Sequence, residues 1–160
     1  MKRRYIIAFV LAALVGVGLH FLYNLCPNPL VALIAPVNES VWEHLKLLFW
    51  PFLAAGWILY TNDRRPGLFG AWMAAELLMP AVLLGAYYTL LSGFGLTGEI
   101  SNIVLFVVTL AIGFWFLYTH RNSPTLARSA GVLTMLVAVY LTCLLLFTIA
   151  PPDFPIFRGN

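Results

Sequence analysis

Long apolar stretches separated by short polar connections make up most of the chain. Five stretches run over roughly residues 5–25, 42–60, 68–91, 100–118 and 130–150. Each has about 19–24 residues, enough for a helix to cross a hydrocarbon layer of about 30 Å. Lipid cannot hydrogen-bond a bare backbone, so each stretch is predicted to be helical. We expect an all-α bundle of five transmembrane helices forming one membrane domain over 1–160, with helices at about 5–25, 38–61, 68–92, 99–119 and 128–150.

The composition agrees with lipid as the solvent. Hydrophobic residues make up 62% of the chain and charged residues only 9%, too few to coat a soluble domain. The net charge of +3 therefore does not indicate a nucleic-acid partner. The expected partner is the lipid bilayer, with a second membrane protein or another copy of the chain as further options.

The basic residues predict an orientation. Seven of the nine lysines and arginines fall on one side of the predicted topology: Lys2, Arg3, Arg4, Arg64, Arg65, Arg121 and Arg128. Only Lys46 and Arg158 fall on the other side. Positive loops face the cytoplasm, so we expect the N-terminus inside and the C-terminus outside. The first stretch is long enough to span and no small-x-small cleavage site follows it, so it is interpreted as a permanent anchor rather than a signal peptide.

Residues 29–36 form an apolar segment that is too short to span and is bounded by prolines. We expect it to be re-entrant or to lie along the outer interface. The second helix follows, and its purely apolar part, residues 47–60, would extend only about 21 Å. Crossing a core of about 30 Å would draw Glu43, His44 and Lys46 to the hydrocarbon edge, where a charge is costly unless paired or hydrated.

Helical spacing indicates where these side chains face. Glu39, Glu43 and Lys46 share nearly one helix face, and Ser40 and His44 form the next row. On the first helix, a small residue recurs at every fourth position: Ala8, Ala12 and Gly16. His20 is the next residue in this row. Small-residue rows let membrane helices approach closely. We therefore predict an outward-facing polar pocket between the first two long helices, lined by His20, Glu39, Glu43 and His44.

Roles follow from the residue types. Glu43 or His44 is the acid–base candidate, and the predicted ligand-binding residues are His20, Asn38, Glu39, Trp42 and Lys46, with Lys46 as an anion contact. Whether the protein is an enzyme stays open. A simpler reading is structural: Ser40-x-x-Glu43 is a capping box, and Glu43 and Lys46 could neutralise each other. No metal or other cofactor is expected. The alternative is a divalent ion, zinc or manganese, held by His20, Glu39, Glu43 and His44.

Glu76 stands apart, inside the third apolar stretch. An acid at membrane depth is a functional candidate by default, here a proton-linked one. It could instead be bonded to a neighbouring hydroxyl such as that of Thr109.

The segment Val37-Asn38-Glu39-Ser40-Val41-Trp42-Glu43-His44-Leu45-Lys46-Leu47-Leu48-Phe49-Trp50-Pro51 resembles the hallmark of a prokaryotic membrane-protein family known only as domain of unknown function 6512. His20-Phe21-Leu22-Tyr23 and the proline-rich end over 147–157 resemble its other features. The resemblance implies a multi-pass protein of the prokaryotic inner membrane, and it implies no reaction.

Three functions are compatible with these observations. The leading hypothesis is a pocket that binds a small polar ligand or a lipid headgroup, with acid–base chemistry as an option. The alternatives are a non-enzymatic partner subunit of a membrane complex and a proton-coupled carrier that uses Glu76 and the outer polar cluster.

Overall fold

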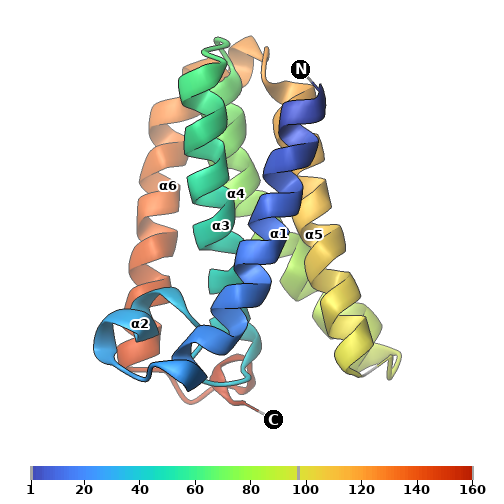
Figure 1. Cartoon of the computed structure of the whole chain (residues 1–160), viewed down its shortest axis with the longest axis vertical. Helices are drawn as coiled ribbons and strands as arrows, with labels where there is room; N and C mark the ends of the chain where they lie inside the picture. Colours follow the sequence, from blue (N-terminus) through green and yellow to red (C-terminus); the bar gives the residue numbers. More distant parts are fainter. Residues whose placement is uncertain (1, 97, 160) are drawn as a thin grey trace.

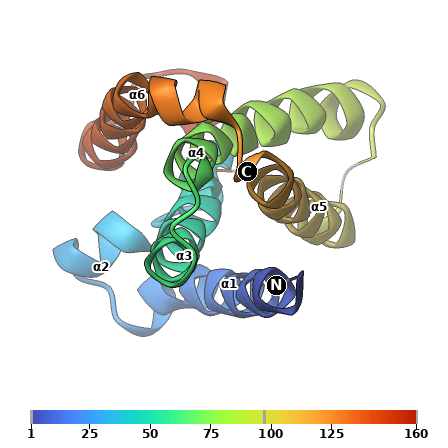
Figure 2. The same cartoon turned by 90° about the horizontal axis from the view of Figure 1, so that it is seen from above.

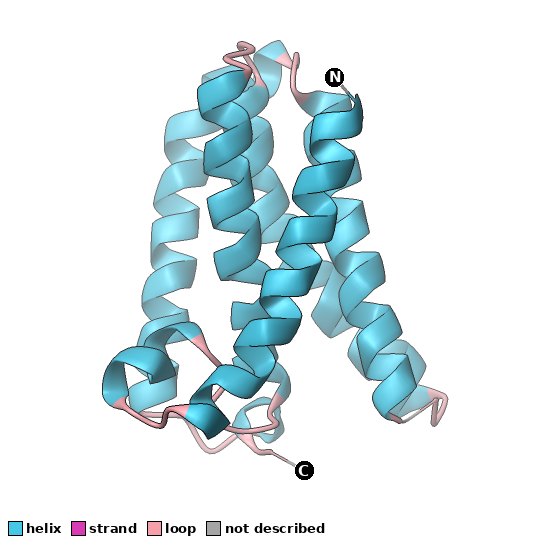
Figure 3. Ribbon diagram, in the orientation of Figure 1, coloured by secondary structure: helices cyan, strands magenta, loops and turns pink. Residues whose placement is uncertain are grey.

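The computed structural model describes residues 2–96 and 98–159, and the regular structure in these ranges is entirely helical (Figure 3). The elements are α1 (Lys2–Leu25), α2 (Pro29–Ile34), α3 (Val41–Asn62), α4 (Leu68–Ala86), the π-helical segment η1 (Tyr87–Gly93), α5 (Glu99–His120), α6 (Pro124–Ile149) and the 3-10 turn η2 (Pro155–Phe157). The all-α prediction is therefore confirmed.

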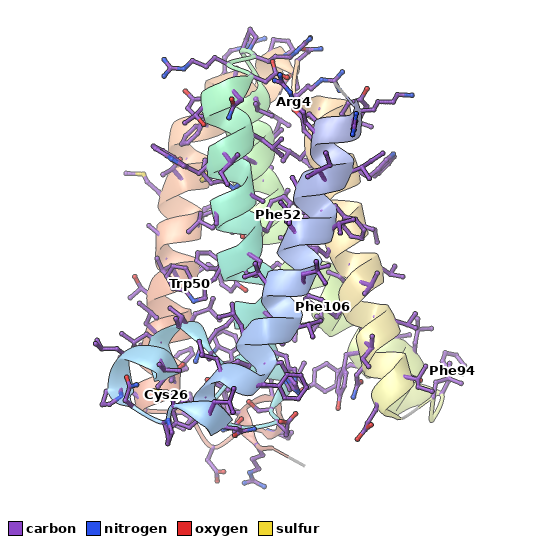
Figure 4. The ribbon with its side chains drawn as sticks, in the orientation of Figure 1. Arg4, Cys26, Trp50, Phe52, Phe94 and Phe106 are labelled. Carbon is purple, nitrogen blue, oxygen red and sulfur yellow. The ribbon has the colours of Figure 1, made fainter. Side chains whose placement is uncertain are left out.

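The long helices α1, α3, α4, α5 and α6 run alternately in opposite directions, and the two termini lie at opposite ends (Figure 1). Viewed from above, α3 and α4 lie between α1 on one side and α6 on the other (Figure 2). α4 packs against α3, α5 and α6, whereas α1 packs against α3 and α5. We call the end that holds α2, residues 35–40 and η2 the motif end. Cys26 lies there and Arg4 lies at the opposite end (Figure 4).

Among the described residues, four helices are long and apolar enough to cross a membrane: α1, α4 with its continuation to Leu90, α5 and α6. α3 is long enough, but Glu43, His44 and Lys46 in its first turns lower its hydropathy. The same shortage of apolar length appears in the sequence, where only residues 47–60 of this helix are purely apolar. A fifth crossing through α3 therefore stays a prediction.

Capping residues explain where the helix boundaries differ from those predicted. α3 begins at Val41 rather than near residue 38, because Ser40 has extended backbone and its side chain caps the helix. α6 begins at Pro124, before the predicted start, because Ser123 is the N-cap and proline suits the first helical turn. α4 gives way to η1 at Tyr87, where the prediction continued one regular helix.

The expected close approach of α1 and α3 is present. A Cβ added to Gly16 would lie 3.0 Å from the carbonyl oxygen of Leu47 and 2.6 Å from the ring of Phe106. Pro51, four residues after Leu47, has no N–H to bond that carbonyl. The backbone of α1 at Gly16 covers the Leu47 carbonyl instead. This contact brings the turn of α1 that holds His20 close to the turn of α3 that holds His44.

Candidate functional site

The short helix α2 lies at the motif end, where its backbone carbonyl groups accept hydrogen bonds from side chains of α3. Asn28 caps it by accepting from the backbone N–H groups of Leu30 and Val31, each at 3.0 Å. From α3, the Trp50 indole N–H donates to the Leu33 carbonyl at 3.1 Å. The proline-bounded segment is thus a single helical turn and a half held against α3, rather than a second span.

Residues 37–43 form a modified helix cap. Ser40 accepts from the Glu43 backbone N–H at 3.3 Å, which is one half of the predicted capping box. In the other half, the carboxylate would accept from the Ser40 backbone N–H, but Asn38 Oδ1 takes that bond at 2.9 Å. The Glu43 carboxylate is therefore free to accept from the Val37 N–H at 2.9 Å.

Glu43 and Lys46 form a buried ion pair with a distance of 2.7 Å between Nζ and Oε2. Their side chains are 3% and 0% exposed. The Lys46 ammonium also donates to the carbonyls of Ala32 and Ala35, at 2.8 and 3.4 Å. The second Glu43 oxygen accepts from the Thr148 hydroxyl of α6 at 2.9 Å. The pair thereby joins α2, the loop, α3 and α6, and all three Lys46 donors are used.

His20, Glu39 and His44 form a separate group, which we call the histidine cluster. The two imidazole centroids lie 5.3 Å apart, and His44 Nε2 lies 3.3 Å from a Glu39 carboxylate oxygen. One nitrogen or oxygen from each residue falls within 4.8 Å of the others. The His44 side chain is 28% exposed and that of Glu39 is 59% exposed, so the cluster is open to the surroundings at the motif end.

The contact of its other nitrogen sets the tautomer of the neutral His44 ring. His44 Nδ1 lies 2.7 Å from the Ser40 carbonyl, which can only accept, so Nδ1 carries a proton. In the neutral ring Nε2 then presents a lone pair, and it faces a carboxylate oxygen that also only accepts. Two acceptors at 3.3 Å require a proton or another cation between them. Nearby, His20 Nδ1 is buried and has no hydrogen-bond partner among the described residues.

Asn38 and Trp42, which were also predicted to bind ligand, make contacts outside the histidine cluster. The Asn38 side chain is used in the cap, and its Cβ lies near Gly159 of the C-terminal segment. Trp42 packs against Phe147 of α6 and Phe157 of η2, with ring centroids 5.5 and 5.0 Å apart. Its indole N–H is buried without a partner among the described residues. The C-terminal segment therefore covers this face of α3.

A groove of about 590 Å³ lies between α1 and α3, where the sequence predicted a pocket. Its lining is nearly all apolar, with Arg4 and Asn62 at one end and Leu19, Ile34 and Trp50 among the lining residues. None of His20, Glu39, Glu43 and His44 lines it. The expected single polar pocket is instead an apolar groove, a buried ion pair and an open histidine cluster.

Glu76 is 1% exposed, at the middle of α4. Neither carboxyl oxygen has a hydrogen-bond partner among the described residues, and the buried Thr109 hydroxyl has none either. The proposed bond between them is therefore absent. The Trp72 indole lies one turn earlier on α4, and its buried N–H also has no hydrogen-bond partner among the described residues.

Sequence reasoning missed Thr148 as a partner of Glu43. The residue lies 105 positions further along the chain, so no local spacing links the two. The available signal was its place in the proline-rich end that resembles the family. No curated protein and no solved structure matches the chain. A family model described as a family of unknown function, DUF6512, matches residues 1–160.

Proposed function

The chain belongs to DUF6512, as its central motif predicted, and we propose that it is a five-span membrane protein that captures a cationic group at its outer face through the histidine cluster. The observation that carries this proposal is the 3.3 Å approach of His44 Nε2 to the Glu39 carboxylate, beside a His20 ring whose Nδ1 has no hydrogen-bond partner among the described residues. The ligand is the ammonium group of a lipid or small molecule, or a metal ion.

The five-span topology supports an outward site. The long helices alternate in direction and the termini lie at opposite ends, as an odd number of crossings requires (Figure 1). Burial of Glu43 and Lys46 as a pair removes the main obstacle to a crossing by α3, because a paired charge costs less at the hydrocarbon edge. With the basic loops inside, the motif end faces outward.

The chemistry of the cluster favours a cation over an anion. Glu39 contributes a negative charge, and His44 contributes a lone pair because its N–H is committed to Ser40. The nearby cation, Lys46, points into the ion pair and has no donor left for an anionic ligand. We accordingly assign Glu43 and Lys46 to holding the motif end together, and leave ligand contact to the histidine cluster.

Nuclear magnetic resonance of the three imidazoles tests the proposal. Protein with ¹⁵N-labelled histidine, purified in detergent micelles, is titrated with ethanolammonium, with micelles doped with phosphatidylethanolamine or phosphatidylglycerol, and with Zn²⁺ and Mg²⁺. We expect at least one cation to shift His20 and His44 saturably while His120, at the far end of α5, stays unchanged. The lipid and the soluble amine distinguish the two ammonium sources.

A matched variant gives the contradicting outcome. Glu39→Gln removes the charge and keeps the shape, and it should weaken any such binding. The proposal fails if no cation in the panel gives a saturable shift, or if Glu39→Gln binds the effective cation as tightly as the wild type does. Equal shifts with phosphatidylglycerol and phosphatidylethanolamine would exclude the lipid ammonium group as the ligand.

A second candidate function, proton-coupled transport, is favoured by the buried carboxyl of Glu76, which has no hydrogen-bond partner in the part of the chain that the structure describes. An acid without a partner at this depth can hold a proton while the bundle keeps it from water. Proteoliposomes containing wild type or Glu76→Gln test this candidate. Cation-dependent proton uptake that the variant abolishes would support it, and no uptake by the wild type would exclude it.

A further inference from the structure

The histidine cluster has the donor set of a transition-metal site. It offers two imidazole nitrogens and one carboxylate oxygen, which is a ligand combination typical of zinc. Magnesium and calcium prefer oxygen ligands, so two imidazoles select against them. The three residues come from α1, the loop before α3 and α3 itself, so only the folded chain assembles them.

The distances fit a tetrahedral ion. Bonds of about 2.0–2.1 Å at the tetrahedral angle place two ligand atoms about 3.3 Å apart. His44 Nε2 and the Glu39 oxygen are separated by 3.3 Å, which is longer than a typical charge-assisted hydrogen bond of about 2.7–2.9 Å. The His20 ligand atom lies within 4.8 Å of both, close enough for a small rotation of its ring to complete the set.

Neighbouring groups also orient the two histidine rings for metal binding. Metal-binding histidines almost always donate their second N–H to a carbonyl or carboxylate, which orients the ring. His44 does this through Nδ1 to the Ser40 carbonyl, at the capped start of α3. His20 is placed by the close contact of Gly16 with Leu47, one turn away on α1. Its buried Nδ1 has no hydrogen-bond partner within residues 2–96 and 98–159, as expected of a ring that a bound ion would engage.

We propose that His20, Glu39 and His44 bind one Zn²⁺ ion at the outer face, with the fourth coordination position open to water or ligand. The inference rests on the proposed function in taking the cluster as a cation site, and it names the cation. Three protein ligands and one open position are the arrangement of reactive zinc sites, whereas closed four-ligand sites are structural. The exposed Glu39 side is where the fourth position would face the surroundings.

Metal titration of the purified full-length protein tests the site. After chelator treatment and dialysis, Zn²⁺ is added in competition with a chromophoric chelator. We expect one ion per chain in the wild type. Glu39→Gln, His20→Ala and His44→Ala should each weaken binding more than about 100-fold, since loss of an outer-shell partner alone costs about 10–100-fold. The matched controls are His120→Ala and Glu99→Gln, at the two ends of α5 and outside the cluster, and they should bind as the wild type does.

A cysteine exchange keeps the test decisive if an alanine variant fails to fold. His44→Cys replaces the imidazole with a thiolate, and bound Co²⁺ should then show a thiolate-to-cobalt charge-transfer band, while His120→Cys should not. Absence of stoichiometric Zn²⁺ binding in the wild type, equal losses in the His120→Ala control, or no such band would overturn the zinc assignment. If ethanolammonium still shifts His20 and His44 when zinc does not bind, the cation site stands and only its metal is wrong; if neither binds, both proposals fail.

Discussion

Gly16 of α1 lies against the Leu47 carbonyl of α3, and a Cβ at Gly16 would lie 3.0 Å from that oxygen. This contact sets the spacing of the two helices one turn from the histidine cluster. Gly16→Leu should therefore lower the free energy of unfolding by about 1–3 kcal/mol, as overpacking does elsewhere. It should also weaken cation binding, because His20 moves away from His44.

Gly18 provides the control on the same helix, because a Cβ there meets nothing within 4 Å. Gly18→Leu should leave both the unfolding free energy, measured by denaturant titration in detergent, and cation binding unchanged. Equal effects from the two substitutions would show that the close approach does not position His20.

The buried pair of Glu43 and Lys46 should contribute strongly to stability. Lys46→Met leaves the Glu43 carboxylate buried without its cation, and loss of one partner from a buried pair costs about 3–5 kcal/mol. The double variant Glu43→Gln/Lys46→Met should lose less than the sum of the two single variants, because neither charge is then left unpaired. Thermal unfolding in detergent measures these effects.

The pair of Asp153 and Arg158 is the exposed counterpart, with side chains 86% and 66% exposed. Arg158→Ala should cost no more than about 1 kcal/mol, the range of surface ion pairs. If Lys46→Met were as mild as Arg158→Ala, the buried pair would not hold the motif end together.

The buried Glu76 carboxyl should lower the free energy of unfolding. A buried polar group without a hydrogen bond costs about 1–3 kcal/mol, so Glu76→Met should leave the unfolding free energy unchanged or raise it. The variant should also bind the cluster's cation normally, since α4 contributes nothing to the cluster. A marked loss of stability would mean that the carboxyl has a partner in the membrane.

Labelling of single cysteines tests the crossing by α3. In a Cys143→Ser background, the native exposed Cys26 should react with a membrane-impermeant maleimide added outside intact cells. A cysteine placed at Asn62, in a Cys26→Ser/Cys143→Ser background, should react only after permeabilisation. Reaction of both from outside would mean that α3 does not cross.

The helical architecture and the pairing of α1 with α3 could be predicted from the sequence. The length of each apolar stretch predicts a helix, and the row of small residues predicts a close helix contact. Both are local patterns that can be recognised within the sequence of a single helix. The row ending at His20 also indicated that this ring faces protein. It does meet His44.

The division of the polar motif into two sites could not be predicted. Helical spacing places Glu43 and His44 on neighbouring faces, but it does not show that Glu43 bonds to Val37 and Thr148 while His44 lies against His20. That outcome depends on the loop before α3 and on the end of α6. Both are long-range features without periodic patterns.

The cation site is tested most directly by the anomalous scattering of a crystal grown in lipid with Zn²⁺. The account predicts one peak bonded to a ring nitrogen of His20, a ring nitrogen of His44 and a carboxylate oxygen of Glu39, at about 2.0–2.2 Å. A map in which His44 bonds directly to Glu39, with no scatterer between them and with His20 turned toward lipid, would contradict it.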